Sequence, residues 1–222
     1  MADFSANNIV KDFETPGQNL RILDGVSLEL NRGDNVAIVG ESGSGKSTFL
    51  HIVGTLDQPT SGTVQLLGTE TTTLAGDALA GHRNQNIGFV FQQHHLLPQL
   101  SALNNVLVPL LASGKPTSEE TGRAKSLLES VGLADRMEHR PAALSGGEQQ
   151  RVAVARAMIC DPVLILADEP TGSLDSQNAA ALGELLLAVQ QEAILICVTH
   201  SDKFASDFSK TIRLESGSFV SN

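Results

Sequence analysis

The chain has 222 residues, 41% of them hydrophobic, with a formal net charge of -10 and a pI near 4.9. This length allows a buried core in one large domain or two small ones. The acidic balance argues against a dedicated nucleic-acid-binding protein, so we expect no nucleic-acid partner. Neither a membrane-spanning run nor a signal peptide is apparent, and we therefore expect a cytoplasmic protein.

The first half of the chain is expected to be mainly β structure. The predicted strands cover residues 20–23, 26–30, 35–39, 63–67 and 87–91. Between the first two strands, Asp24-Gly25 is a turn signal. The helix that follows the strand at 35–39 is predicted over residues 47–53.

The second half begins with a helical pattern, from about residue 96 to 159. Apolar residues recur there at helical spacing up to Val131, and Gly132 stands at the expected stop. Strands return at 163–167 and 194–198, with a helix between them at about 176–191. We therefore predict an α/β core at about 1–92 and 160–222, interrupted by a helical insert at about 93–159.

The most informative run lies between the strand at 35–39 and the helix after it. It reads Gly40, Glu41, Ser42, Gly43, Ser44, Gly45, Lys46 and Ser47, and it matches the phosphate-binding pattern G-x-x-x-x-G-K-[ST]. The glycines let backbone N–H groups converge on phosphate oxygens, and the helix N-terminus adds partial positive charge. Lys46 can reach the β- and γ-phosphates, Ser47 can bind Mg²⁺, and Thr48 completes the predicted nucleotide site. A glycine-rich turn is the plainer alternative, but the flanking strand and helix favour a phosphate site.

Two carboxylates end the apolar strand at 163–167. Asp168 is expected to hold Mg²⁺, directly or through water, because a buried strand delivers its last side chain to a fixed place. Glu169 is placed to orient or deprotonate the water that attacks a γ-phosphate. Asp-Glu-Pro could also simply end a strand, but a phosphate loop on the same chain favours the catalytic interpretation.

A second decisive run reads Leu144, Ser145, Gly146, Gly147, Glu148 and Gln149. Ser145 and Glu148 fit a capping box that opens a helix. A helix start fronted by a hydroxyl and two glycines is a second anion site on one chain. An ordinary capped helix would explain the serine and the glutamate but not the glycine pair.

With these motifs the chain resembles the ATP-binding-cassette (ABC) family of transporter ATPases, from about residue 8 to 218. The run 144–149 matches that family's signature motif. The resemblance implies an α/β fold of the P-loop NTPase class, with a RecA-like core, an N-terminal antiparallel β region and an inserted α-helical subdomain. It also implies ATP and Mg²⁺ as ligands and ATP hydrolysis as the reaction.

The resemblance assigns roles to further residues. Gln92 follows the strand at 87–91, as the family's glutamine loop does, and would bind Mg²⁺ and sense the γ-phosphate. His200 resembles the switch histidine that contacts the γ-phosphate, although alone it would pass for a surface histidine. The loop that crosses the dimer interface is matched by Ser173, Leu174 and Asp175.

The family also implies a homodimer. Two subunits would pair head to tail around two ATP molecules, with the phosphate loop of one facing the signature segment of the other. Phe13 stands where the family often has a tyrosine that stacks on adenine, and this chain has no tyrosine. Phenylalanine can stack but cannot hydrogen-bond, and Phe13 could equally be a core residue.

The segment after Gln92 carries a finer resemblance. In this family it meets integral-membrane permease subunits, and residues 94–98 and 139–141 resemble the branch for lipoprotein release and macrolide-type export. This resemblance implies an ATPase at the cytoplasmic face of the inner membrane that drives lipoprotein release. A macrolide-type exporter, a division-site complex and a soluble ABC ATPase acting on DNA or ribosomes are the alternatives. Adjacent His94 and His95 could also form a metal site, but no cysteine or carboxylate stands beside them.

Overall fold

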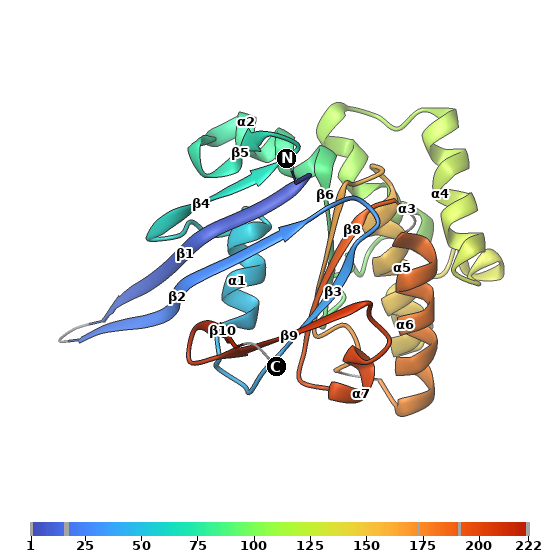
Figure 1. Cartoon of the computed structure of the whole chain (residues 1–222). Helices are drawn as coiled ribbons and strands as arrows, with labels where there is room; N and C mark the ends of the chain where they lie inside the picture. The colour runs from blue at the N-terminus through green and yellow to red at the C-terminus, as the bar shows by residue number, and fades with distance from the viewer. Residues whose placement is uncertain (1, 16–17, 173, 191, 221–222) are drawn as a thin grey trace. The chain divides into compact units, whose positions relative to one another are not determined.

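The computed structural model describes residues 2–15, 18–172, 174–190 and 192–220 (Figure 1). Contacts divide the chain into two compact units, Met1–Arg83 with Glu192–Asn222, and Asn84–Gln191. These boundaries do not coincide with the predicted core and insert, which stay a prediction. Within the described ranges, every helix is too short or too polar to cross a lipid bilayer.

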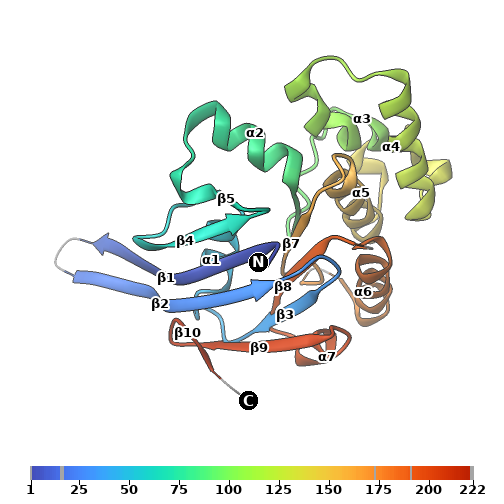
Figure 2. The same ribbon diagram turned by 45° about the horizontal axis from the view of Figure 1, so that its top comes forward.

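The first unit contains an antiparallel sheet near the N-terminus (Figure 2). Its strands, in the order β2-β1-β4-β5, are β2 (Gln18–Leu30), β1 (Phe4–Thr15), β4 (Ser61–Leu66) and β5 (Thr69–Glu70). Phe4 and Ala6 on β1 are fully buried, and so is Ile9 beyond a register shift, because one face of the sheet packs on the core. The unit therefore has the antiparallel N-terminal region that the resemblance implied.

The predicted turn at Asp24-Gly25 is wrong, because β2 continues through it. The pairing with β1 changes register at this point, between the pairs Ile9–Val26 and Lys11–Leu23. Gly25 has φ 74°, which a glycine adopts without steric cost. The signal that predicted a turn marks a β-bulge instead.

The first unit also holds the strand that leads into the phosphate loop. This strand, β3, belongs to a second group of strands in the same unit. In the order β10-β9-β3-β8, they are β10 (Ser218–Val220), β9 (Lys210–Glu215), β3 (Asn35–Val39) and β8 (Ile194–Thr199). β3 has parallel neighbours on both sides, and Val36, Ala37 and Ile38 are fully buried. The helices here are α1 (Lys46–Val53), α7 (Asp202–Ala205) and the short turn η1 (Thr71–Thr73). A central buried strand holds the start of the phosphate loop rigidly.

The second unit pairs two parallel strands, β6 (Ile87–Phe91) and β7 (Leu164–Asp168). Helix α2 (Gly76–Asn86), most of which belongs to the first unit, precedes β6 along the chain. The other helices are α3 (Ala102–Leu107), α4 (Ser118–Ser130), α5 (Gly146–Met158) and α6 (Ser176–Gln190). Short 3₁₀ turns are η2 (Val108–Ser113), η3 (Ala134–Arg136) and η4 (Pro141–Ala143).

Helix α5 is the centre of the second unit. It packs on β6, α3, α4 and α6, and Val152 and Ala155 on it are fully buried. Its fit against β6 is tight at Gly88, where a Cβ would meet the carbonyl oxygen of Ala157. α5 is therefore held in its own unit by neighbours on several sides.

Candidate functional site

The phosphate loop leaves β3 at Gly40 and enters α1 at Lys46. Gly45, the N-cap residue, has φ 104°, and a Cβ there would lie 2.9 Å from the carbonyl oxygen of Ile22. A Cβ on Gly40 would meet the carbonyl oxygen of Leu214. Neither position tolerates a side chain, because backbone atoms of the same unit lie against it.

Lys46 is the first residue of α1 and is only 6% exposed. Its Nζ donates to the carbonyl oxygens of Gly40 and Glu41, each at 2.8 Å. The Oγ of Ser44 is buried and has no hydrogen-bond partner among the described residues. A buried ammonium and an orphaned hydroxyl at a helix N-terminus fit an anionic ligand that would satisfy both.

His200 lies at the same sheet edge as the phosphate loop. Val39 and Thr199 are partners in the parallel pairing of β3 with β8, and Gly40 and His200 each follow directly. His200 is exposed. Parallel strands end at one edge, so the structure brings this predicted residue to the loop, where ligands bind in α/β folds.

The second unit repeats this arrangement with different residues. Phe91 and Asp168 are partners in the pairing of β6 with β7, and Gln92 and Glu169 each follow directly. Glu169 has φ 45°, in the left-handed region that a residue with a Cβ seldom adopts. Such strain is found where the surroundings impose it, often at functional sites, and it marks Glu169 as a candidate functional residue.

A further residue of this site, Gly172, was not predicted from the sequence. A Cβ on Gly172 would lie 2.5 Å from Nε2 of Gln92 and 2.9 Å from its Cδ. The Gln92 side chain therefore lies directly against the backbone of the loop that follows Glu169. The sequence signal was a glycine four residues after Asp168, but only the fold shows what it approaches.

The signature segment forms the predicted capping box at the start of α5. The backbone N–H of Ser145 donates to Oε2 of Glu148 at 2.7 Å, and the backbone N–H of Glu148 donates to Oγ of Ser145 at 3.3 Å. The N–H of Ser145, followed by its hydroxyl and by Arg136, lowers the pKa of Glu148 below its ordinary value. The chain's own side chains therefore satisfy the first donors of this helix.

The glycine pair of this segment is not tightly packed. Among the described residues, no heavy atom lies within 4 Å of a Cβ built on Gly146, and those near one on Gly147 are at ordinary contact distance. Neither glycine has a positive φ. Nothing described within the chain therefore requires glycine at either position, and an outside group that approaches the backbone is the remaining reason.

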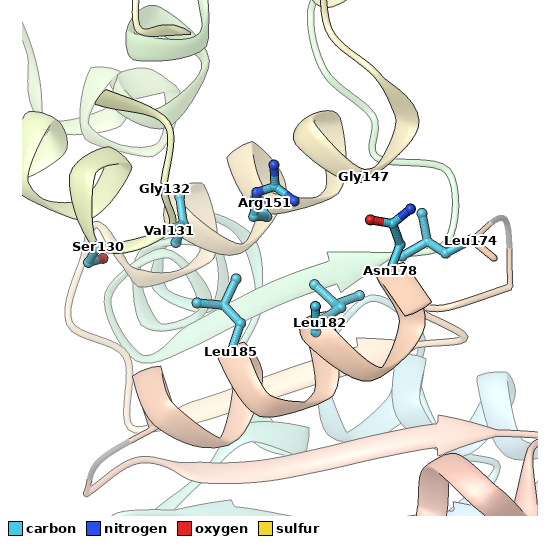
Figure 3. A pocket seen from close by; sticks show the side chains of 10 residues that line it. Ser130, Val131, Gly132, Gly147, Arg151, Leu174, Asn178, Leu182 and Leu185 are labelled. Carbon is cyan, nitrogen blue, oxygen red and sulfur yellow. The ribbon is translucent and has the colours of Figure 1, made fainter. Parts of the chain in front are cut away.

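A pocket of about 320 Å³ opens beside Gly147, between α5 and α6 (Figure 3). It is lined by Leu182 and Leu185 of α6, by Arg151 of α5 and by Leu174. Leu174 belongs to the predicted interface loop, which therefore lies near the signature segment within this unit.

Gln149, the last residue of the signature segment, contacts the turn before α5. Its Nε2 donates to the carbonyl oxygens of Pro141 and Leu144, each at 3.1 Å, and holds that turn.

The interface loop leads directly into α6. Asp175 accepts hydrogen bonds from the backbone N–H groups of Gln177 and Asn178, at 3.1 and 2.9 Å. These bonds and one from the Asn178 side chain keep the pKa of Asp175 below its ordinary value. Ser173, the third predicted residue of this loop, lies outside the described residues.

Phe13 lies on β1 and is 42% exposed, so the core interpretation of this residue is wrong. The Nζ of Lys11 lies 4.9 Å from the centroid of its ring and also pairs with Asp57 at 2.8 Å. A cation over one face leaves the ring positioned and its exposed side open to a ligand.

The comparisons with known proteins bear directly on these motifs. Residues 23–172 match the family model described as ABC transporter. The chain belongs to the ABC transporter family. The fold class and the family that the motifs predicted are therefore confirmed.

Two relatives are similar to this ABC chain over nearly their whole length. The lipoprotein-releasing system ATP-binding protein LolD 1 of Rhodopirellula baltica is 50% identical, over 96% of this chain and 94% of that protein. The protein LolD of Geobacter metallireducens is 47% identical, over 97% and 96%. Among solved structures, the dimeric structure of MJ0796, a bacterial ABC transporter cassette, superposes with a TM-score of 0.88 at 39% identity, over 98% of this chain and 97% of that one.

The alternative of a metal site at the paired histidines finds no support in the geometry. Among the residues that the structure describes, no three His, Cys, Asp or Glu side chains gather to hold an ion. The ring of His94 bonds instead to the side chain of Gln150, and that of His95 packs edge-on against Phe91.

Proposed function

We propose that this chain is the ATP-hydrolysing subunit of a lipoprotein-releasing ABC transporter. The observation that carries the proposal is the identity of 50% over nearly full length with a LolD protein, together with an intact phosphate loop and signature segment. The chain would lie at the cytoplasmic face of the inner membrane and pass the energy of ATP binding and hydrolysis to membrane subunits.

ATP would bind through the phosphate loop, with Lys46 on the β- and γ-phosphates. The buried ammonium, the orphaned Ser44 hydroxyl and the open N-terminus of α1 fit that ligand. Ser47, Gln92 and Asp168 would hold Mg²⁺, because their side chains carry the oxygen atoms that this ion prefers. A bound Mg²⁺ would neutralise the charge that develops on the phosphates during transfer.

Glu169 is the residue we assign to the attacking water. It follows directly after the end of β7, its backbone has an uncommon φ of 45°, and a carboxylate at a strand end can serve as the general base for attack on a γ-phosphate. His200, at the edge of the first unit's sheet, would contact the γ-phosphate from beside the phosphate loop. Gln92 would report the presence of that phosphate to the segment that follows it.

The signature segment would act on the ATP of a second copy of the chain. Gly146 is exposed with no described atom within 4 Å of its Cβ position, Gly147 beside it has neighbours only at ordinary contact distance, and Ser145 adds a hydroxyl at the same helix start. Leu174 and Asp175 would lie at the interface between the two copies. We therefore propose a homodimer that closes around two ATP molecules, with Phe13 stacking on adenine.

A groove after Gln92 is the surface we assign to a membrane subunit. Its volume is about 450 Å³, and it is lined by Gln92, Gln93, His94, His95, Leu96, Pro141 and Gln149. The exposed Leu97 beside it is held in place, because the buried side chain of Asn105 accepts from its N–H at 2.7 Å and donates to its carbonyl oxygen at 3.1 Å. An exposed apolar side chain on a held backbone beside a groove suits a short helix of a partner.

The catalytic assignment is tested with Glu169→Gln. Because this change removes the base but keeps the shape, we expect ATP to bind as before, hydrolysis to fall by about a thousandfold and an ATP-bound dimer to accumulate. Phosphate release and sedimentation measure the two effects. Normal turnover in the variant would rule out Glu169 as the base.

The transport assignment is tested with the same variant, tagged and loaded with Mg-ATP. Detergent-solubilised native membranes would be passed over it, and the captured proteins identified by mass spectrometry. We expect membrane subunits of a lipoprotein-releasing system, and we expect Leu97→Asp to lose them while it keeps ATP binding. Capture of only DNA- or ribosome-associated proteins would contradict the transport assignment.

A further inference from the structure

The ammonium group of Lys11 lies over one face of the Phe13 ring. Both residues belong to β1, two positions apart. The distance from Nζ to the ring centroid is 4.9 Å, which is within the range where a cation is attracted to the π-electrons of a ring. One face of this ring is therefore occupied by a cation of its own strand.

The ammonium group is also held from a different segment of the first unit. Its Nζ donates to Oδ1 of Asp57 at 2.8 Å and to the carbonyl oxygen of Gln58 at 2.7 Å. Both acceptors lie between α1 and β4. Only 12% of the Lys11 side chain is exposed. A lysine stem is flexible on its own, but two short bonds and this burial keep the cation of Lys11 at one place beside the ring.

Arg21, on the neighbouring strand β2, provides a comparison. Its guanidinium pairs with Asp12 and with Asp24, each at 2.9 Å, and the side chain is exposed. Exposed ion pairs of this kind contribute little to stability. Lys11 is the more buried of the two cations and lies against an aromatic face, so its role is to be sought at the ring of Phe13.

The apolar surface around Phe13 extends to the neighbouring strand. Leu20 is the partner of Phe13 in the pairing of β1 with β2, and 49% of it is exposed. Residues directly opposite each other in an antiparallel pair have their side chains on the same face of the sheet. Phe13 and Leu20 therefore form an exposed apolar platform, which a flat ligand could cover.

A cation on one face of a ring changes what the other face binds. The ammonium draws π-electron density toward itself, so the opposite face becomes poorer in electrons and stacks better on an electron-rich aromatic surface. Adenine, a purine with an exocyclic amine, is such a surface. Because phenylalanine offers no hydrogen bond to a base, stacking is the main contact that Phe13 can give.

We propose that Lys11 is a positioning residue for the nucleobase of ATP and acts through the ring of Phe13. It holds the ring in one orientation and strengthens stacking on the face that it leaves open, and Leu20 extends the platform. This inference rests on the proposed ATPase function, in which Phe13 stacks on adenine. It deepens that function with a residue that belongs to none of the motifs in the sequence.

The test measures the affinity of the full chain for ADP and for pyrophosphate, by competition against a fluorescent ADP. ADP carries the base, whereas pyrophosphate carries only the phosphates. Lys11→Met keeps an apolar stem and removes the charge, so we expect ADP affinity to fall about threefold and pyrophosphate affinity to stay unchanged. Phe13→Leu should lower ADP affinity about tenfold, and adding Lys11→Met to it should cause no further loss.

Three further variants separate the cation from its other contacts. Lys11→Gln keeps a hydrogen-bond donor for Asp57 and Gln58 but has no charge, so it should lose as much ADP affinity as Lys11→Met. Lys11→Arg keeps the cation and should bind ADP within about 1.5-fold of the wild type.

Arg21→Met is the matched control. It removes one positive charge from the same hairpin without touching the ring, and its ADP affinity should also stay within about 1.5-fold of the wild type. Thermal unfolding shows that each variant is folded at the assay temperature. If Lys11→Met is not folded, Lys11→Gln takes its place in every comparison.

Three results would overturn the inference and leave the ATPase assignment intact. The first is wild-type ADP affinity in both Lys11→Met and Lys11→Gln. The second is an equal loss of pyrophosphate affinity, which would mean a general effect of charge on the phosphates. The third is the same loss on adding Lys11→Met to Phe13→Leu, which would mean that Lys11 acts without the ring. A wild-type chain that binds neither ATP nor ADP would instead overturn the proposed function, and this inference with it.

Discussion

The phosphate loop and the signature segment are both glycine-rich turns at the start of a helix, but they contain glycine for different reasons. Gly45 is required by the chain itself, because of its φ of 104° and the Ile22 carbonyl beside it. Gly146 has ordinary backbone geometry and open space at its Cβ position among the described residues. Contacts within the chain therefore explain the glycines of the phosphate loop, whereas we propose that the glycines of the signature segment leave room for a ligand of a second chain.

The largest expected effect tests the claim that contacts within the chain require glycine at position 45. Gly45→Ala forces a Cβ into a left-handed position 2.9 Å from a backbone oxygen, so the free energy of unfolding should fall by about 3 kcal/mol. Gly43→Ala is the matched control, because Gly43 has φ 84° but no described atom within 4 Å of its Cβ position. Its cost should be about 1 kcal/mol. Urea unfolding measures both, and equal costs would contradict the steric account.

The next effect tests the claim that Gly146 leaves room for a ligand from outside the chain. Gly146→Ala should leave stability unchanged or slightly raised, since alanine is the better helix former, while ATP hydrolysis falls about a hundredfold. Gly122→Ala, at an open position of α4, should give the same small stability change without loss of activity. Full activity in Gly146→Ala would mean that no ligand approaches the pair.

A smaller effect sharpens the role of the glutamine loop. Gly172→Ala places a Cβ against the flexible end of Gln92, which can move aside at little cost in stability. The displaced amide should lower turnover about tenfold while the melting temperature stays within about one degree of the wild type. Turnover equal to the wild type would show that the position of Gln92 is not critical.

The smallest effect concerns the capping box of the signature helix. The pKa of Glu148 is lowered in the folded chain, so its charge contributes stability above the unfolded pKa and loses it as pH falls through the folded pKa. Glu148→Gln should therefore cost about 0.5 kcal/mol at neutral pH, and the cost should vanish as pH falls below about 4. Urea unfolding at a series of pH values tests this, and a difference that is constant with pH would contradict it.

Local patterns were enough to predict the elements around the phosphate loop. The buried run 35–39 and the helix after it were predicted correctly, because an apolar strand and a glycine-rich loop are recognisable within a few residues. β1 was missed, since polar residues such as Asn7 and Asn8 interrupt its apolar pattern. α2 was missed as well, because none of its residues is buried and so no apolar face marks it.

The sequence predicted the site residues that belong to recognisable motifs, but not the contacts between them. Asp168, Glu169 and Ser145 stand in recognisable runs, whereas the contact between Gly172 and Gln92 joins residues 80 positions apart. Gln150 and Arg156 likewise appeared in the sequence only as residues of a helix. Their side chains donate hydrogen bonds to the backbone carbonyl oxygens of Phe91, His94 and His95. These bonds depend on how α5 packs on β6, which no local pattern encodes.

The most direct measurement of the central claim is sedimentation of Glu169→Gln with and without Mg-ATP, beside the double variant that adds Gly146→Ala. The account predicts an ATP-dependent dimer for the single variant and a monomer with unchanged ATP affinity for the double variant, because the added methyl group blocks the signature from the second chain's nucleotide. A double variant that still dimerises with ATP would contradict the claim that the glycine pair is open for a partner's ATP.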